Sequence, residues 1–368
     1  MIVYFSVLII ICLICLFDNK GDGKRPLLIS VGLIYLMITL QEGWGGDSEF
    51  YINVSDLYYG WGYSLDDLMN MDESERHGEL GYKIMFTILP SYRIITFICA
   101  AVLCFAVYVL VYNFIPRKYW SLFFILMFIN KYMLMGDISA LPRNGLAASI
   151  FLLAVYFLSR NKKIPYLVLV LFGALFHKSI LVFLPFVFVP KRPLKIHPLA
   201  GVLVLLLVAV FSAVAPGSWG EIISTFLSGS DYLDAYSHYL DETVAHFDLT
   251  LLVPFIIFWG GVLFYSTSKE GQSDKNYFFL NFAIFTIAFR LLPGIGMSDR
   301  LFFYMDYCMF AGLLIACDKF KPQKGEYFSL GTIVIISILF VYGRWFLEFS
   351  RTLHFIQHWM QYNPIFNL

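Results

Sequence analysis

Residues 164–192 read IPYLVLVLFGALFHKSILVFLPFVFVPKR, and this stretch decides how the rest of the chain is interpreted. Between Pro165 and Val189, the only acidic or basic side chains are His177 and Lys178, at the middle of the run. Such a pair within an apolar run of membrane length is costly, so it is a functional hypothesis by default. Basic residues lie on both sides of the run: Arg160, Lys162 and Lys163 before it, and Lys191, Arg192 and Lys195 after it.

The composition is that of a membrane protein. Hydrophobic residues make up 59% of the chain and charged residues 14%, against about 25% charged residues in soluble domains. The net charge of zero favours no nucleic-acid partner. We expect an all-α polytopic membrane protein that forms a single integral domain over residues 1–368. Its apolar runs are 2–17, 27–41, 92–115, 119–136, 144–159, 165–189, 199–215, 249–266, 277–292, 301–317 and 327–347.

The distribution of Lys and Arg predicts the topology, because short basic loops belong in the cytoplasm. Loops 18–26, 116–119 and 160–164 are basic, whereas 43–78 is acidic. Further along the chain, 190–198, 267–276 and 318–326 contain Lys or Arg, and 216–248 contains neither. The two halves agree only if 165–189 begins and ends in the cytoplasm.

The run 165–189 is therefore predicted to be a broken or re-entrant helical hairpin, added to about ten full transmembrane helices. Its apex is His177-Lys178, and each leg has about twelve residues, or about 18 Å of helix. The apex would then lie at depth beneath a water-filled cavity that opens outward. The alternative is one tilted helix of about 37 Å, which would place the basic 190–198 loop outside.

With this topology, ionisable residues gather on the outer side of the membrane. Acidic and aromatic residues follow the second helix, and Glu79 leads back toward the membrane. Other charges flank short outer turns that contain glycine and proline. The outer loops 43–90 and 216–248 are expected to cover the cavity. The candidate residues are Asp47, Glu49, Tyr51, Glu79, Arg143, His177, Lys178, Arg290, Asp299 and Arg300.

Each residue type suits one part of a reaction on a phosphorylated, lipid-linked substrate. Arginine binds diphosphate oxygens through two parallel hydrogen bonds, so Arg143, Arg290 and Arg300, with Lys178, are expected to bind the diphosphate. A carboxylate or a neutral imidazole can take a proton from a sugar hydroxyl. The aromatic and acidic side chains of the outer loops suit sugars, and Glu49, Tyr51 and Asp299 are the candidates.

Several segments together resemble the EpsG family of bacterial exopolysaccharide proteins, related to the Wzy-type O-antigen and capsule polymerases. They are GGDSEFYINV (45–54), GELGYKIMFTIL (78–89), LPRNGLAASIFLLAVYFL (141–158), ALFHKSILVFLPFVF (174–188) and SDRLFFYMDY (298–307). No single segment is highly specific, but their order and spacing are. Where the family pattern favours glutamine after the arginine, this chain has Asn144.

The resemblance implies a glycosyltransferase-C-like helical fold and a metal-independent glycosyltransferase without a cofactor. It implies a polymerase that joins undecaprenyl-diphosphate-linked oligosaccharide repeat units at the outer face of the bacterial cytoplasmic membrane. The expected partners are these glycans, membrane lipids, and flippase and chain-length regulator proteins. It carries onto Asp47, Glu79, Arg143, His177, Lys178 and Arg300.

In the expected mechanism, an acceptor hydroxyl attacks the anomeric carbon of the donor and lipid diphosphate leaves. His177 or Glu79 takes the proton, and Asp47 orients the acceptor or the base. Two alternatives remain open at this stage. A flippase or exporter of the same glycan also suits charges at depth and a broken helix. An O-antigen ligase or single-sugar transferase would need the same leaving-group pocket.

Overall fold

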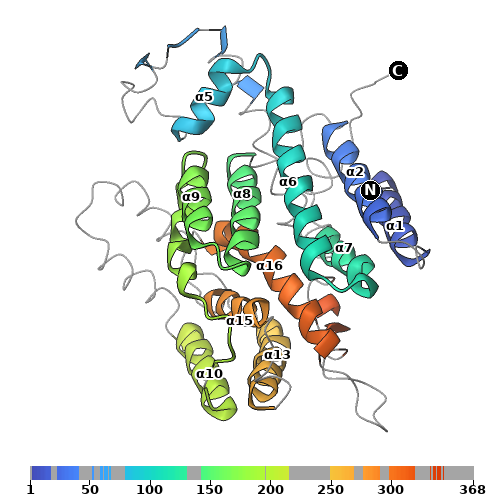
Figure 1. The fold of residues 1–368 in the computed structure, drawn as a ribbon, viewed down its shortest axis with the longest axis vertical. Helices are drawn as coiled ribbons and strands as arrows, with labels where there is room; N and C mark the ends of the chain where they lie inside the picture. The colour runs from blue at the N-terminus through green and yellow to red at the C-terminus, as the bar shows by residue number, and fades with distance from the viewer. Residues whose placement is uncertain are drawn as a thin grey trace. The chain divides into compact units, whose positions relative to one another are not determined.

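Every regular element that the computed structural model describes is a helix (Figure 1). The described residues are 2–17, 23–40, 52–53, 59–60, 62–64, 66–67, 79–130, 142–194, 196–214, 249–268, 277–290, 298–319, 332, 335–336, 338–340 and 343. The chain divides into two compact units, Met1–Phe188 with Tyr342–Leu368, and Val189–Val341.

The first unit is a row of packed helices in which α7 packs on α1, α1 on α2, α2 on α6, α6 on α8, and α8 on α9. Hydrogen bonds between side chains and backbone join neighbouring helices, as where the Tyr4 hydroxyl donates to the carbonyl of Phe128 at 2.6 Å. The helices are α1 (Ile2–Phe17), α2 (Lys24–Thr39), α5 (Leu80–Ile88), α6 (Tyr92–Phe114), η2 (Arg117–Tyr119), α7 (Trp120–Ile129), α8 (Pro142–Ser159), α9 (Lys163–Ala174) and η4 (Lys178–Phe188).

Helix α6 is the one described helix that is both long enough and apolar enough to cross a bilayer. It has 23 residues, or about 34 Å at 1.5 Å per residue. Ser91 caps its start by accepting a hydrogen bond from the Ile94 amide. One face is buried, and the other exposes large apolar side chains such as Ile98 and Phe105. An exposed apolar face of this kind suits contact with lipid.

The hairpin prediction is confirmed as a backbone shape. Helix α9 ends at Ala174 and η4 begins at Lys178, so the chain reverses at residues 175–177. The Tyr166 hydroxyl donates to the carbonyl of Phe183 at 2.5 Å. The Lys163 ammonium lies 5.9 Å from the ring centre of Phe188. The two ends of the run therefore lie side by side, and the alternative of one tilted helix is wrong.

The returning leg is a 3₁₀-helix of 11 residues, although 3₁₀ runs longer than three or four residues are uncommon. Pro185 lies inside it. Proline has no amide hydrogen and its ring clashes with the carbonyl four residues earlier, so it disfavours a continuous α-helix here. At about 2 Å per residue this leg rises about 22 Å, against about 18 Å for the α-helical leg.

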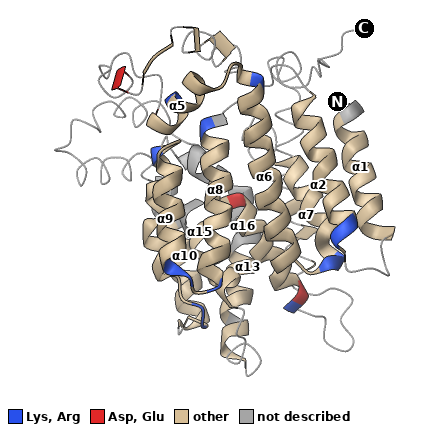
Figure 2. Cartoon of the chain, turned by 45° about the horizontal axis from the view of Figure 1, so that its top comes forward, with Lys and Arg blue, Asp and Glu red and all other residues tan. Residues whose placement is uncertain are grey.

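Basic residues gather at the end of the first unit that lies away from the hairpin apex. The Lys24 ammonium, at the start of α2, lies 6.0 Å from the Tyr112 ring near the end of α6. The Arg160 Nη2 donates to the Asn113 Oδ1 at 3.3 Å. Figure 2 shows blue segments near the lower ends of α2 and α7. The loops 18–26, 116–119 and 160–164 thus begin or end at one end of the helix row, as the topology requires.

The second unit contains α10 (Pro198–Val214), α13 (Leu249–Thr267), α15 (Phe278–Arg290) and α16 (Ser298–Lys319). Helix α10 packs on α13, and α15 packs on α16. The Tyr277 hydroxyl donates to the carbonyl of Val262 at 2.8 Å, which ties α15 to α13. The Asn281 amide donates to the carbonyls of Pro190 and Arg192, both at 2.8 Å. These two bonds fix the chain that leaves the hairpin.

The helices match the predicted apolar runs closely, but two predictions need comment. The predicted outer segment 43–90 contains a helix, α5, at residues 80–88, and its place over the cavity stays a prediction. The ten full crossings stay a prediction, because α6 alone among the described helices has the length and hydropathy of a span. The other apolar helices found by that criterion are shorter. Most of the predicted run 327–347 lies outside the described residues.

Candidate active site

Glu79 is the residue on which the candidate site is built. It precedes α5, but its carboxylate does not cap that helix. One oxygen, Oε2, instead accepts a hydrogen bond from the Arg143 Nη1 at 3.1 Å, which forms an ion pair. The other, Oε1, accepts from the backbone N–H of Lys178 at 3.2 Å. A single carboxylate therefore joins the start of α8 to the start of η4.

Helix electrostatics explain this arrangement. Pro142 is the first residue of α8, a favoured position for proline, and Arg143 follows in the same turn. A cation in the first turn of a helix is disfavoured, because the helix dipole places partial positive charge there. The free amide hydrogens at a helix start also need an acceptor. The carboxylate of Glu79 meets both needs, for Arg143 and for the first amide of η4.

Gly81 brings α5 against the hairpin apex. Its backbone N–H donates to the carbonyl of Leu175 at 2.8 Å. A Cβ at this position would lie 2.8 Å from the same oxygen and 3.0 Å from the Leu175 Cβ. The approach therefore requires glycine, and Figure 1 shows α5 at the upper ends of α8 and α9. The starts of α5, α8 and η4 consequently meet at one place.

His177 lies at the apex with its ring buried. Its backbone N–H donates to the carbonyl of Gly173 at 3.0 Å, which continues the bonding pattern of α9 into the turn. Its Nδ1 lies 2.7 Å from the Ser179 Oγ and 3.3 Å from the Ser179 amide nitrogen. Lys178, between them, has an exposed side chain. The buried imidazole and the exposed ammonium thus occupy adjacent positions of one turn.

The side chains around the ion pair are partly protected from water. The side chain of Glu79 is 10% exposed and that of Arg143 is 25% exposed. The Arg143 guanidinium carbon lies 5.9 Å from the ring centre of Tyr82, within the range of a cation–π contact. Partial burial strengthens the ion pair, because screening by water is weaker than at an open surface. It also leaves the guanidinium within reach of a ligand.

Four predicted site residues, Glu79, Arg143, His177 and Lys178, are therefore brought together. The predicted residues Asp47, Glu49 and Tyr51 lie outside the described residues. Arg290 ends α15, and Asp299 and Arg300 lie in the first turn of α16, all in the second unit. Nothing in the described geometry tests the predicted roles of these last six residues.

The sequence analysis did not identify several residues that the structure places in or near the site, or buries in a helix. Ser179 is the neighbour of the His177 ring, and Gly81 permits the close approach of α5. Lys83 is a buried lysine on α5, four residues after Glu79, and Asp306 is a buried aspartate in α16. The rule that singled out His177, an ionisable residue within an apolar helix, would also have found Asp306. Lys83 could have been found by its helical spacing from Glu79.

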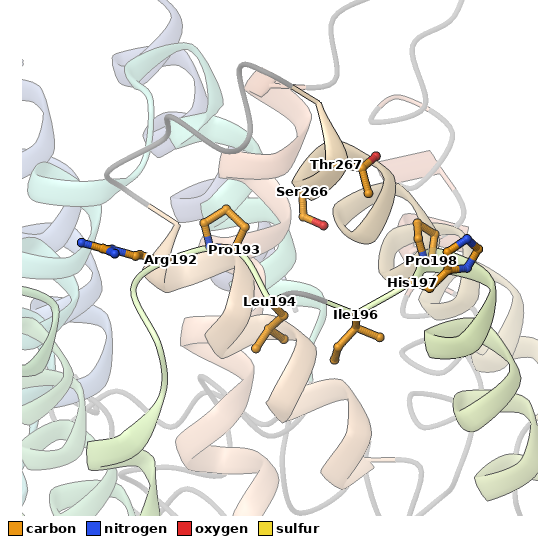
Figure 3. A pocket seen from close by; sticks show the side chains of 8 residues that line it. All are labelled: Arg192, Pro193, Leu194, Ile196, His197, Pro198, Ser266 and Thr267. Atoms are coloured by element: carbon orange, nitrogen blue, oxygen red, sulfur yellow. The ribbon is translucent and has the colours of Figure 1, made fainter.

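A cavity of about 590 Å³ lies in the second unit, where the chain enters α10 and α13 ends (Figure 3). It contains none of the predicted site residues. In Figure 3 the guanidinium of Arg192 extends away from the other lining side chains. Among the described residues, no three His, Cys, Asp or Glu side chains are grouped so that they could hold a metal ion. The cavity is lined by Arg192, Pro193, Leu194, Ile196, His197, Pro198, Ser266 and Thr267.

Comparison with protein families decides the relationship. The model of the EpsG family matches residues 24–363, which is nearly the whole chain. The chain belongs to the EpsG family. EpsG proteins are Wzy-like polymerases, so membership supports a polymerase-type role in polysaccharide biosynthesis. No curated protein and no solved structure matches the chain.

Membership of the EpsG family agrees with the apolar composition and the apolar helices, which indicate a membrane protein. The match includes all the segments that carried the resemblance, from 45–54 to 298–307. It therefore includes Glu79, Arg143, His177 and Lys178, the residues that the fold brings together. Metal independence, the leaving group and the side of the membrane stay predictions.

Proposed function

We propose that the protein is a polysaccharide polymerase that joins undecaprenyl-diphosphate-linked oligosaccharide repeat units at the outer face of the cytoplasmic membrane. The observation that carries this proposal is the meeting of Glu79, Arg143, His177 and Lys178 where α5, α8 and η4 begin, in a chain of the EpsG family. Helix starts carry partial positive charge and favour phosphate groups. A guanidinium, an ammonium and an imidazole in the same place add to that preference.

The reaction is a glycosyl transfer. The acceptor hydroxyl oxygen forms a bond to the anomeric carbon of the donor, and the bond from that carbon to the diphosphate oxygen breaks. The electron pair leaves with the diphosphate, where Arg143 and Lys178 stabilise the developing negative charge. The hydroxyl proton goes to a basic side chain, for which the predicted catalytic set offers His177, Glu79 and Asp47.

The apolar surroundings support a lipid-linked substrate. Large apolar side chains are exposed at the end of α9 and in the turn that follows it, namely Leu171, Phe172 and Leu175. These side chains would contact a prenyl chain whose diphosphate lies at Arg143. A soluble sugar nucleotide would gain nothing from such a surface. We therefore favour a prenyl diphosphate as the leaving group.

The decisive experiment is to delete the gene and determine the lipid-linked glycans by mass spectrometry. We expect single repeat units on prenyl diphosphate to accumulate outside the membrane, because flipping continues while polymerisation stops. The same units trapped inside would contradict the proposal and favour a flippase. Polymer that still forms but stays on its lipid carrier would favour a ligase. Complementation with the Arg143→Lys variant tests whether the phenotype depends on this site.

A further inference from the structure

The hydrogen bonds of His177 determine which of its ring nitrogens carries the proton. The Ser179 backbone N–H can only donate, and it lies 3.3 Å from the Nδ1 of His177. The Nδ1 must therefore accept, so it carries no hydrogen. In a neutral imidazole the proton then lies on Nε2. The Ser179 hydroxyl, 2.7 Å from the same Nδ1, acts as a second donor.

The opposite tautomer is disfavoured by the same geometry. A hydrogen on Nδ1 could be accepted by the Ser179 Oγ, but it would face the hydrogen of the Ser179 amide. Both contacts lie in a buried part of the turn, where His177 and Ser179 are 8% and 6% exposed. Unfavourable polar contacts in such surroundings are poorly compensated by water. The amide and the hydroxyl of Ser179 thus favour the same tautomer.

We propose that Ser179 is a positioning residue that holds His177 as an Nε2–H donor toward the lipid diphosphate, so that His177 is not the general base. This inference rests on the proposed function and deepens it. A ring whose remaining nitrogen carries a hydrogen donates to an oxyanion and cannot take a proton from a sugar hydroxyl. The proton of the acceptor then goes to a carboxylate, and the predicted catalytic set contains Glu79 and Asp47.

The tautomer can be tested without turnover. The full-length protein is labelled with nitrogen-15 in its histidine rings, reconstituted in lipid vesicles and measured by solid-state NMR. The sequence has seven histidines, so the His177 signals are assigned by comparison with His177→Gln. We expect an unprotonated Nδ1 and a protonated Nε2, both in the unsubstituted protein and in Ser179→Ala, because the backbone N–H of residue 179 still donates to Nδ1. A protonated Nδ1 in the unsubstituted protein would overturn the proposal.

Turnover of purified lipid-linked repeat units tests the donor role. His177→Gln places an amide donor near the position of Nε2–H and should keep activity within about tenfold, whereas His177→Leu should lose about 10²–10³ in kcat. Ser179→Ala should lower kcat about fivefold, as the loss of one hydrogen bond does. It should add nothing in the His177→Gln background, because the ring that it positions is absent.

Ser149→Ala is the matched control. Ser149 is also buried in the first unit, and its hydroxyl donates to the Gly145 carbonyl at 2.7 Å. We expect this variant to keep its activity in both backgrounds. If wild type elongates glycans but His177→Gln is as inactive as His177→Leu, the donor role is wrong. If wild type makes no polymer, the proposed function fails, while NMR still decides the tautomer.

Discussion

At the scale of the residue, the carboxylate of Glu79 binds groups at the starts of two helices, α8 and η4, and does not cap α5, the helix that it precedes. Its two oxygens bind Arg143 and the amide of Lys178, which lie 64 and 99 residues further along the chain. The sequence predicted all three residues as site members, because each carries charge near an apolar run. It did not predict that they bind one another, since that depends on how α5 packs on the hairpin.

Replacement of Arg143 by lysine tests whether the shape of the guanidinium matters. The variant keeps the positive charge but loses the planar fork that binds two oxygens. We expect a loss of about 1.5–3 kcal/mol, or roughly ten- to a hundredfold in kcat/KM, with normal expression. The control is Arg160→Lys, at the opposite end of α8. Wild-type kcat/KM in Arg143→Lys would show that no bidentate contact is made.

The Glu79–Arg143 ion pair should also be visible in stability. We expect Glu79→Gln and Arg143→Gln each to lower the melting temperature in detergent, because each leaves a partly buried partner without its counter-charge. The double variant should melt no lower than the less stable single variant. Coupling between contacting residues is typically about 0.5–3 kcal/mol. Additive losses would mean that the pair contributes no net interaction to stability.

The sequence identified site residues whose charge interrupts an apolar run. It did not identify a small, uncharged partner of such a residue. His177 and Lys178 are conspicuous, because they interrupt residues 165–189. Ser179 follows them directly, but serine is common in apolar helices and gives no signal by itself. The partner of His177 became visible only when the turn at 175–177 placed the Ser179 hydroxyl beside its ring.

At the scale of the element, the hairpin shows what loop charge can predict. Basic residues on both sides of the run predicted that the chain returns to its starting side, and Lys163 beside Phe188 shows that the two ends of the run lie side by side. The 3₁₀ geometry of the second leg could not be read from the sequence. Pro185 disfavours an α-helix, but one proline usually causes a kink rather than a long 3₁₀ run.

Gly81 tests the contact between α5 and the hairpin apex. Gly81→Ala would place a Cβ 2.8 Å from the carbonyl oxygen of Leu175, so α5 must move and its amide bond to Leu175 must weaken. We expect a loss of about 1–3 kcal/mol, typical of overpacking, read as a lower melting temperature and reduced turnover.

Gly32→Ala is the control for this substitution, because nothing lies within 4 Å of the added Cβ. Gly32 also lies within an α-helix, α2, where alanine is favoured over glycine by about 1 kcal/mol. We expect Gly32→Ala to melt at the same temperature or higher. If Gly81→Ala behaves in the same way, α5 does not rest on the apex as described.

At the scale of the whole molecule, the end of the first unit that is rich in Lys and Arg lies away from the apex. Lys24, Arg160 and Lys163 lie near the ends of α2, α8 and the hairpin. Short basic connections face the cytoplasm. The Glu79–Arg143 site is then predicted to face outward, the side on which we propose that repeat units are joined. The order of charges along the chain predicts this sidedness.

Accessibility to a membrane-impermeant thiol reagent tests this orientation in intact cells. The six native cysteines are first replaced. Single cysteines are then introduced at Lys178 and at Arg160, which lie at opposite ends of the first unit. We expect Lys178→Cys to react with reagent added from outside, because its side chain is exposed at the apex, and Arg160→Cys to react only after the cells are opened. The reverse pattern would invert the topology.

The return of the hairpin to its own starting side has a consequence for how insertions and deletions can accumulate in the gene. Adding or removing one transmembrane helix inverts the orientation of all the helices that follow it. Adding or removing a re-entrant hairpin leaves their orientation unchanged. Removal of residues 164–188 should therefore leave α10 and later helices in their native orientation, although His177 and Lys178 are lost. Removal of α8 should turn them over. The hairpin can therefore be lengthened, shortened or replaced without changing the orientation of the other helices in the membrane.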